Sequence, residues 1–352
     1  MKFIYDNQRY ALSEICSLET EDQWLIDIQS FLREWTNDSN EIVVNTSGST
    51  GIPKQIQLSK NAIKTSAGIT IDYFCLRPAM TLLLCLPVRF IAGKLMIIRA
   101  LESNSDLILK MPSSNPLETL ETKIDFAAMT PFQVSKTLIQ TPEKLNLIST
   151  LLLGGGGISQ SQRKALHSLT STQCYLSYGM TETITHVAIQ KISKPTLKPI
   201  FKVLDGFQIA QDERSCLVIE ADHIYQKKVV TNDIVEMVDS DRFIWKGRWD
   251  NIINSGGIKI SPEEVETKIE MLINIPFFIY WIPDEELGQK IVLFIKNKRR
   301  NSEEEVVLLS KLKKTLNKYE MPRSILYLDC FDYTDTGKIR RQHTFQKYFK
   351  HA

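Results

Sequence analysis

Short apolar runs that alternate with helix-like segments constrain the fold of this 352-residue chain more than any other feature. Between residues 81 and 177 the pattern predicts strands at 81–86, 107–109, 126–129, 151–153 and 174–177, separated by helices at 93–101, from 131 onward and at 159–169. Strands that follow one another through helices usually pair in parallel, and the helices then cover both faces of the sheet. We therefore expect an α/β protein.

The pattern changes after residue 190. Shorter strands and turns, at 186–192, 216–221, 234–238 and 242–246, indicate a small antiparallel, β-rich subdomain. Near residue 250 a second unit begins, with a capping box from Ser261 to Glu264 at the start of a helix. We expect a large domain of residues 1–249, mainly parallel sheet covered by helices, and a small α+β domain of residues 250–352.

Composition excludes several classes of protein. Apolar residues make up 43% of the chain, charged residues 24%, and the net charge is only +2, which fits a soluble globular protein and disfavours a nucleic-acid binder. The six cysteines and five histidines show no metal-binding spacing. The chain starts without a signal-peptide pattern and contains no apolar run long enough to span a membrane, so we expect a cytoplasmic protein.

A loop rich in glycine and hydroxyl residues joins two predicted strands, at 42–44 and 55–58. Its polar and flexible members are Thr46, Ser47, Gly48, Ser49, Thr50, Gly51 and Lys54. Glycines let backbone N–H groups approach an anion, hydroxyls donate hydrogen bonds, and the lysine adds positive charge, as a polyphosphate requires. An ordinary P-loop is disfavoured because Gly51 is followed by Ile-Pro-Lys and a strand. A flexible surface turn is the alternative.

Two further polar segments follow predicted parallel strands. The strand at 151–153 runs into four glycines, at 154–157, where ligands of α/β sheets usually lie. The strand at 174–177 is followed by Tyr178, Gly179, Thr181 and Glu182. Tyrosine can stack on a base, threonine can donate to a phosphate, and glutamate can hold Mg²⁺. Plain turns are the alternative for both segments.

Three charged residues later in the chain complete the candidate site. Asp233 can accept hydrogen bonds from a ribose diol, Arg248 can reach ribose or phosphate, and Lys338 on a Thr-Gly turn can deliver positive charge. Taken alone, the first two residues fit a surface ion pair equally well, and Lys338 fits a solvated basic tail.

Taken in order, these segments resemble the adenylate-forming superfamily of acyl-CoA synthetases, adenylation domains and luciferases. The matching motifs are Thr-Ser-Gly-Ser-Thr-Gly-x-Pro-Lys from residue 46, Tyr-Gly-Met-Thr-Glu from 178, Asp233, Gly-Arg-Trp-Asp from 247, Ser-Gly-Gly from 255 and Thr-Gly-Lys from 336. The resemblance implies two steps. A carboxylate attacks the α-phosphorus of ATP to give an acyl-adenylate and pyrophosphate, and a thiol then displaces AMP.

The resemblance also implies a role for each motif residue. The loop of residues 46–54 would hold the β- and γ-phosphates, while Gly155, Gly156 and Tyr178 would frame the adenine, and Gly179 is a further ATP-binding residue. Thr181 would contact the α-phosphate and Glu182 would help to bind Mg²⁺. Asp233 and Arg248 would hold the ribose, and Lys338 would bridge the carboxylate and the α-phosphate. We count Lys338, Thr181, Glu182 and Arg248 as the catalytic residues.

The small domain is expected to be mobile. In the family's cycle it swings about a hinge, here Asp250, so that Lys338 withdraws and the segment Ser255, Gly256 and Gly257 serves the thioester step. Only fourteen residues follow Lys338, so we expect the thiol to come from a separate molecule, with CoA as the simplest candidate. The oligomeric state stays open, with a homodimer among the options.

For the acid, the length of the chain and the segment 86–94 look most similar to short bacterial o-succinylbenzoate–CoA ligases of menaquinone synthesis. That substrate is a dicarboxylate, so its second carboxylate needs a cation, for which Arg89 and Lys94 are candidates. The predicted acid-binding residues are Arg89, Phe90, Lys94, Ser177 and Gly154. Alternatively, Arg89 is structural and Lys94 reaches solvent.

Several features depart from the superfamily. The phosphate loop begins close to the N-terminus, so much of the first subdomain is missing, and Asn232 replaces a common glycine. None of these departures removes a residue assigned to chemistry. Two alternatives to an o-succinylbenzoate–CoA ligase are an adenylating enzyme that loads another acid onto CoA or a carrier protein, and an inactive nucleotide-binding regulatory homologue, against which the retained motif residues argue.

Overall fold

The computed structural model of the chain describes residues 1–45, 55–192, 199–221, 224, 228–297, 302–334 and 337–349. The N-terminal residues lie at one edge of the main sheet, as the hairpin β1 (Phe3–Tyr5) and β2 (Gln8–Tyr10) and the helices α1 (Leu12–Ser17) and α2 (Gln23–Thr36). Asp22 caps α2 by accepting a hydrogen bond from the backbone N–H of Trp24 at 2.9 Å. The buried face of α2 is apolar apart from Gln29 and carries Trp24, Leu25, Ile28, Phe31, Leu32 and Trp35.

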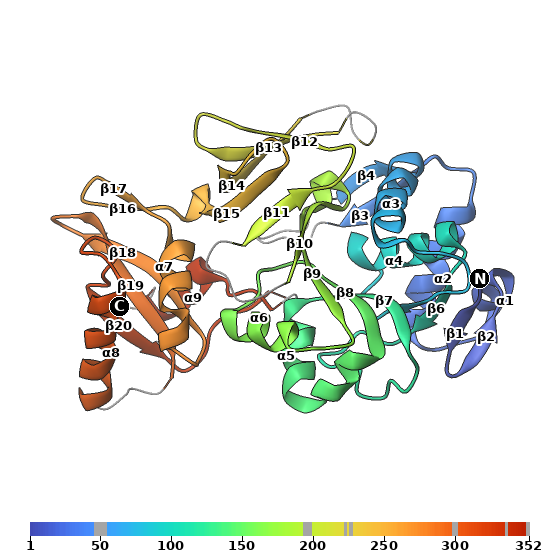
Figure 1. The fold of residues 1–352 in the computed structure, drawn as a ribbon, viewed down its shortest axis with the longest axis horizontal. Coiled ribbons are helices and arrows are strands. Elements are labelled where there is room, and N and C mark those ends of the chain that lie inside the picture. Colours follow the sequence, from blue (N-terminus) through green and yellow to red (C-terminus); the bar gives the residue numbers. More distant parts are fainter. Residues whose placement is uncertain are drawn as a thin grey trace.

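The centre of the main sheet is parallel, as the alternating pattern predicts. The chain continues through β3 (Glu41–Asn45), β4 (Gln55–Ser59), α3 (Lys60–Phe74), β5 (Thr81–Leu84), α4 (Ile91–Ser103), β6 (Asp106–Leu109), β7 (Ile124–Met129), α5 (Pro131–Gln140), η1 (Pro142–Leu147), β8 (Ile148–Leu153), α6 (Gln160–His167) and β9 (Gln173–Gly179). Strands β5 to β9 pair in parallel in the order β6-β5-β7-β8-β9. Figure 1 shows α3 and α4 on one side of these strands and α5 and α6 on the other.

The antiparallel strands extend the same sheet. They are β10 (His186–Lys191), β11 (Ile200–Val203), β12 (Gln208–Gln211), β13 (Cys216–Glu220), β14 (Val229–Met237) and β15 (Arg242–Arg248), and the turn η2 (Thr181–Thr183) precedes them. Strand β10 pairs with β9, so the described strands of the sheet run without a break from β12 to β2. The carboxyl ends of β8 and β9 therefore lie beside the antiparallel strands.

Residues 250–349 form what we call the C-terminal part. It contains η3 (Trp249–Asn251) at its start, β16 (Ile253–Ser255), β17 (Ile258–Ile260), α7 (Pro262–Ile269), η4 (Glu270–Leu272), β18 (Phe277–Asp284), β19 (Gly288–Lys296), α8 (Ser302–Thr315), β20 (Ser324–Leu328) and α9 (Arg341–Phe349). Its strands make a separate sheet, with β19 between β18, β20 and the β16–β17 hairpin.

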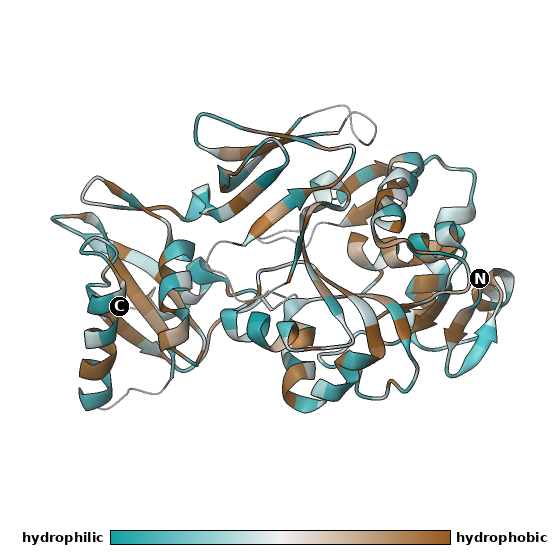
Figure 2. Cartoon of the chain, viewed as in Figure 1, coloured by the Kyte–Doolittle hydropathy of each residue, from teal (hydrophilic) through white to brown (hydrophobic). Residues whose placement is uncertain are grey.

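The main sheet and the C-terminal sheet have separate hydrophobic clusters. One cluster runs from Phe3 to Phe243, and two others, built from residues 253–349, cover the two sides of the C-terminal sheet. Figure 2 shows the apolar colour concentrated on strands and the polar colour on outer helix faces. The architecture confirms the predicted α/β class with a small C-terminal α+β unit, and the separate clusters favour our proposed boundary near residue 250. In the part of the chain that the structure describes, no helix is long and apolar enough to cross a membrane.

Candidate active site

Asp233 is the centre of a cluster formed by three strands. It lies on β14 directly opposite Arg248 of β15, and the residue is 6% exposed. The Tyr178 hydroxyl, at the end of β9, donates to Asp233 Oδ2 at 2.8 Å, and Trp245 Nε1 donates to Oδ1 at 3.1 Å. The Arg248 guanidinium lies 3.7 Å from the same Oδ1. The carboxylate is thus fixed in one orientation.

Electrostatics keep the Tyr178 phenol neutral. Burial raises its pKa far above the ordinary value, and the neighbouring negative charge of Asp233 raises it further. A neutral phenol is a donor to Asp233, while its ring packs edge-on against Phe201 and Phe243. Tyr178 therefore both orients the carboxylate and offers an aromatic edge to the site.

Lys338 reaches this cluster from the C-terminal part. Its Cε lies 3.5 Å from the point where a β-carbon on Gly156 would stand, beside the glycine run that follows β8. Its turn is closed by hydrogen bonds from the Gly337 and Lys338 amides to Thr334, and Gly337 has a φ of +82° against the ring of Phe132. A side chain at residue 337 would be strained and crowded there.

The charge of Lys338 is sensitive to its neighbours. The residue as a whole is exposed, yet the protein around its ammonium removes enough water to lower the pKa of Lys338, and the like charge of Arg248 lowers it further. Asp233 acts in the opposite direction. An anion placed between Lys338 and Arg248 would relieve this repulsion.

The turn after β9 presents Thr181 and Glu182 at the same edge. A β-carbon on Gly179 would come within 2.3 Å of the Thr185 carbonyl oxygen, so the turn folds directly onto Gly179. Ile184 is buried with a φ of 63°, which is a strained conformation for a β-branched residue. Thr183 supports the turn by accepting from the Met180 amide at 3.0 Å and donating to the Thr185 carbonyl at 2.7 Å.

Asp250, the predicted hinge, is held by two side chains. Arg248 donates to its carboxylate at 2.9 Å, and the Asn232 amide donates at 3.1 Å. Arg214 in turn donates to Asn232 at 2.9 Å. Sequence reasoning noted Asn232 only as a departure and missed Arg214 and Trp245, because their partners lie far away in the sequence.

Much of the chain matches a known enzyme family. Residues 9–211 match the family described as AMP-binding enzyme. The chain belongs to the AMP-binding enzyme family. An acyl-CoA synthetase (AMP-forming)/AMP-acid ligase II-like protein from Dyadobacter fermentans is 34% identical, with a TM-score of 0.64 over 96% of this chain and 98% of the other.

Other relatives of this AMP-binding enzyme are more distant. The 2-succinylbenzoate–CoA ligase of Lactococcus lactis is 25% identical over 89% of this chain and 72% of its own length. The o-succinylbenzoate coenzyme A synthetase of Bacillus subtilis, solved with ATP and magnesium ion, is 18% identical, has a TM-score of 0.73 and covers 86% and 69% of the two chains, which shows a shared fold. These matches confirm the predicted superfamily and identify an AMP-forming acid–CoA ligase.

The described structure brings together Gly156, Tyr178, Asp233, Arg248 and Lys338, as the motifs predict. Ser177 and Gly154 also adjoin, because the Ser177 hydroxyl donates to the Leu153 carbonyl at 2.9 Å. The roles of all these residues stay predictions.

Other predicted residues of this AMP-binding enzyme lie outside that cluster. The loop of residues 46–54 lies outside the described residues, although β3 and β4 pair up to it as an antiparallel hairpin. The segment Ser255–Gly257 forms the turn between β16 and β17, which Figure 1 places at the outer end of the C-terminal part.

The two predicted cations for the acid have other surroundings. Lys94 Nζ lies 3.3 Å from Glu34 and 4.1 Å from the centre of the Phe31 ring, so its charge is already paired. Arg89 is exposed and stacks on Phe90 at 4.9 Å. Their role as acid-binding residues stays a prediction, and for Lys94 the pairing with Glu34 argues against that role.

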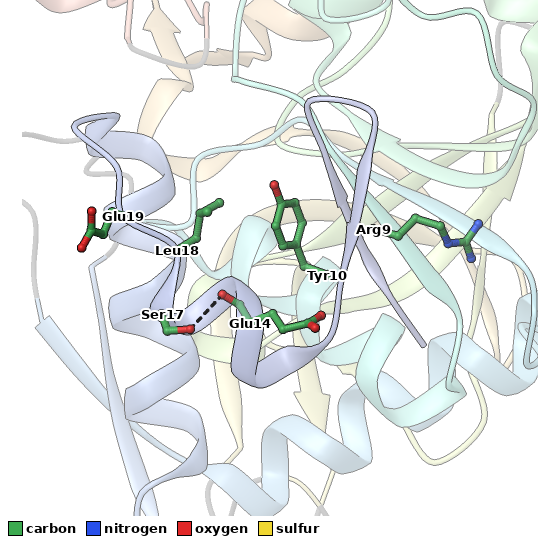
Figure 3. A pocket seen from close by; sticks show the side chains of 6 residues that line it. All are labelled: Arg9, Tyr10, Glu14, Ser17, Leu18 and Glu19. Atoms are coloured by element: carbon green, nitrogen blue, oxygen red, sulfur yellow. Dashed lines mark hydrogen bonds between the residues drawn. The ribbon is translucent and has the colours of Figure 1, made fainter.

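An open hollow of about 400 Å³ lies elsewhere, near the N-terminus. Figure 3 shows the side chains that line it: Arg9, Tyr10, Glu14, Ser17, Leu18 and Glu19. None of the predicted site residues lines this hollow.

Proposed function

We propose that this enzyme is an o-succinylbenzoate–CoA ligase. In the first step, one carboxylate of the acid attacks the α-phosphorus of ATP and releases pyrophosphate. In the second step, the thiol of CoA attacks the acyl carbon and releases AMP. The similarity of the chain to 2-succinylbenzoate–CoA ligases and to an acyl-CoA synthetase-like protein supports the reaction class. The convergence of Tyr178, Asp233, Arg248 and Lys338 on one edge of the sheet carries the proposal for the nucleotide.

Asp233 is proposed to hold the ribose. A carboxylate offers about four acceptor positions, and Tyr178 and Trp245 use one on each oxygen. The remaining positions can accept from the two ribose hydroxyls. Arg248 beside Asp233 would then contact ribose or phosphate, and the glycine run together with Tyr178 would frame the adenine.

Lys338 and Thr181 are proposed to act on the reacting groups. The carboxylate and the α-phosphate are both negative, and they repel each other as they approach. Lys338, placed at Gly156, would lower this repulsion, and the Thr181 hydroxyl would donate to the α-phosphate. No protein nucleophile is needed, because catalysis consists of alignment and charge neutralisation. Residues 46–54 are proposed to hold the β- and γ-phosphates.

Glu182 fits a role in Mg²⁺ binding. Its carboxylate is exposed on the turn, and no ion pair to it is found among the described residues. Mg²⁺ commonly takes one or two carboxylates and completes its shell with phosphate oxygens and water. When bound, the ion would neutralise charge on the triphosphate.

Arg99, which the sequence interpretation missed, favours an acid with a second negative group. This residue of α4 is 3% exposed, and burial lowers its pKa to about 9. One amino group donates to the Thr185 hydroxyl at 3.3 Å and the other faces the Met96 sulfur at 3.6 Å. Its Nε has no hydrogen-bond partner, and no carboxylate pairs with Arg99 among the described residues.

An unpaired buried guanidinium is costly unless a ligand supplies the missing charge. Thr185, its partner, lies only four residues after Thr181, the proposed contact of the α-phosphate. His186 beside it stays neutral, since burial and the charge of Arg99 hold its pKa well below the usual value. We therefore assign the second carboxylate of the acid to Arg99 rather than to Lys94.

The test is ATP–pyrophosphate exchange with matched acids. We expect activity with o-succinylbenzoate and much less with 2-acylbenzoates that lack the second carboxylate. Arg99→Gln should raise the KM for o-succinylbenzoate by roughly ten- to a hundredfold, as expected for the loss of a hydrogen-bonded ion pair, and should narrow the difference between the two acids. Arg77→Gln, at an exposed position outside the predicted site, is the control and should leave that difference intact. Equal use of both acids by the wild type would contradict the assignment.

The remaining alternatives separate by product. Mass analysis of reactions with CoA and with a carrier protein distinguishes a CoA ligase from a carrier-loading enzyme. A chain that binds ATP but exchanges no pyrophosphate with any acid would be the regulatory homologue. The cytoplasmic location, the homodimer and the service of Ser255–Gly257 in the thioester step stay predictions.

A further inference from the structure

Glu270 joins the C-terminal part to a helix of the main sheet. It is the first residue of η4, and its Oε1 accepts a hydrogen bond from the backbone N–H of Gln160 at 2.6 Å, across 110 residues of sequence. Gln160 is the first residue of α6. In Figure 1, α6 lies on the side of the parallel strands that faces the C-terminal part.

The N-terminal end of α6, where Glu270 binds, favours a carboxylate. The first N–H groups of a helix have no partner within the helix, and the helix dipole places positive charge at this end. Arg163, one turn into α6, is buried and attracts the Glu270 charge, and the Ser159 hydroxyl also faces the carboxylate. Partial burial raises the pKa of Glu270, while the Gln160 amide and Arg163 act against this rise.

The same orientation of the C-terminal part delivers Lys338. The glycine run beside Lys338 leads into α6, whose N-cap is Ser159 and whose first backbone N–H donates to Glu270. The turn that carries Lys338 packs its Gly337 against Phe132 of α5, the neighbouring helix. If the C-terminal part rotated away, the contact of Glu270 with α6 and the approach of Lys338 to Gly156 would be lost together.

We propose that Glu270 is a positioning residue for the first half-reaction. The contact of its carboxylate with the N-terminal end of α6 holds the C-terminal part in the orientation that places Lys338 at the glycine run. This contact breaks before the thioester step. The proposal rests on the two-step reaction proposed above. It assigns to Glu270 no contact with substrate.

The kinetic test compares Glu270→Gln with Glu270→Ala. Glutamine keeps an oxygen that can accept from Gln160 but loses the charge, whereas alanine loses both. We expect ATP–pyrophosphate exchange to fall by about tenfold for alanine and less for glutamine, while thioester formation from preformed acyl-adenylate stays at the wild-type rate or rises. Glu303→Gln, an exposed carboxylate on α8, is the control and should change neither step. Equal loss in both half-reactions, or no loss in either, would overturn the proposal.

A second measurement reports orientation without any reaction. Spin labels on Ile139→Cys in α5, 73% exposed, and Val307→Cys in α8, 54% exposed, give the distance between the two parts. In the background protein, Cys16, Cys75 and Cys330 are replaced by serine because a spin label could reach them. The other three cysteines are buried and are kept. We expect one main distance in the wild type and a broader or shifted distribution for Glu270→Ala.

The two measurements together separate a failure of the proposed function from a failure of the positioning role of Glu270. If no acid is adenylated but the distance distribution shifts in Glu270→Ala, the proposed function fails and the positioning role stands. If the wild-type enzyme is active and the distribution is the same in both proteins, the positioning role is wrong. Thermal unfolding of each variant verifies that it is folded, and the glutamine variant carries the test if the alanine variant does not fold.

Discussion

Asp233 shows how a single carboxylate is prepared for a ligand. Tyr178 and Trp245 each donate to one of its oxygens, and Arg248 balances its charge from 3.7 Å. Together these neighbours leave some acceptor positions of the carboxylate free. At the scale of the residue, the site is therefore fixed in geometry before any nucleotide binds, which reduces the entropy lost on binding.

Replacing Asp233 by Asn should weaken ATP binding. The amide can accept at only one atom, so one of the two fixed donors loses its partner and Arg248 loses its counter-charge. We expect the KM for ATP to rise roughly ten- to a hundredfold, since hydrogen bonds to charged groups contribute about 1.5–3 kcal/mol. Pyrophosphate exchange at varied ATP measures this, with exposed Asp205→Asn as the control. An unchanged KM would remove Asp233 from the site.

The protonation of Lys338 should limit the rate of adenylation at high pH. Its pKa is lowered by the surrounding protein and by Arg248, so the free enzyme should lose kcat/KM at a lower pH than an ordinary lysine would cause. Bound ATP adds negative charge, raises the pKa and should move the alkaline limb of kcat to higher pH. Profiles of pyrophosphate exchange measure both limbs, and coincident limbs would contradict the assignment.

The turn between β9 and β10 is the element that sets the shape of the site. Gly179 ends β9, and the chain folds back so closely that the Thr185 carbonyl occupies the space of a side chain at residue 179. The strained φ of Ile184 belongs to the same turn. Thr181 and Glu182 are thus held by backbone packing.

Two glycine-to-alanine changes should act in opposite directions. Gly179→Ala should destabilise the fold by about 2 kcal/mol, because the new methyl overpacks against backbone that cannot move freely. It should also displace Thr181 and reduce activity.

Gly68→Ala, in α3 with no atom within 4 Å of the new β-carbon, should instead stabilise the fold by about 1 kcal/mol through helix propensity. Denaturant unfolding measures both, and a stable, active Gly179→Ala would refute the packing argument.

At the scale of the whole molecule, one site is assembled from two parts. The main sheet supplies Asp233, Arg248 and the glycine run, and the C-terminal part supplies Lys338. Within the C-terminal part, Arg341 of α9 pairs with Glu263 at 2.6 Å and Glu266 at 2.7 Å on α7. These ion pairs hold α9, and with it the preceding Lys338 turn, against the helix that follows the proposed hinge.

Lys338→Ala should therefore separate the two half-reactions. We expect adenylate formation to fall by roughly a hundredfold or more, as for the loss of a charge-stabilising group in a transition state. Thioester formation from preformed acyl-adenylate should be spared, because Lys338 is proposed to withdraw before that step. Single-turnover assays of each half-reaction measure this, and equal loss in both would contradict the proposed rotation.

Local pattern determined much of this protein. Apolar periodicity predicted the parallel strands, because that signal lies within a few residues of sequence. The resemblance of short motifs to the adenylate-forming superfamily implied that Tyr178, Asp233, Arg248 and Lys338 surround one nucleotide, and the structure brings these residues together. Only the tertiary structure revealed the unpaired charge of Arg99, the pairing of Lys94 with Glu34 and the seat of Glu270 on α6. Each of these three residues contacts a partner that is 60 or more residues away in the sequence. Such a contact forms only when the tertiary fold brings the two segments together.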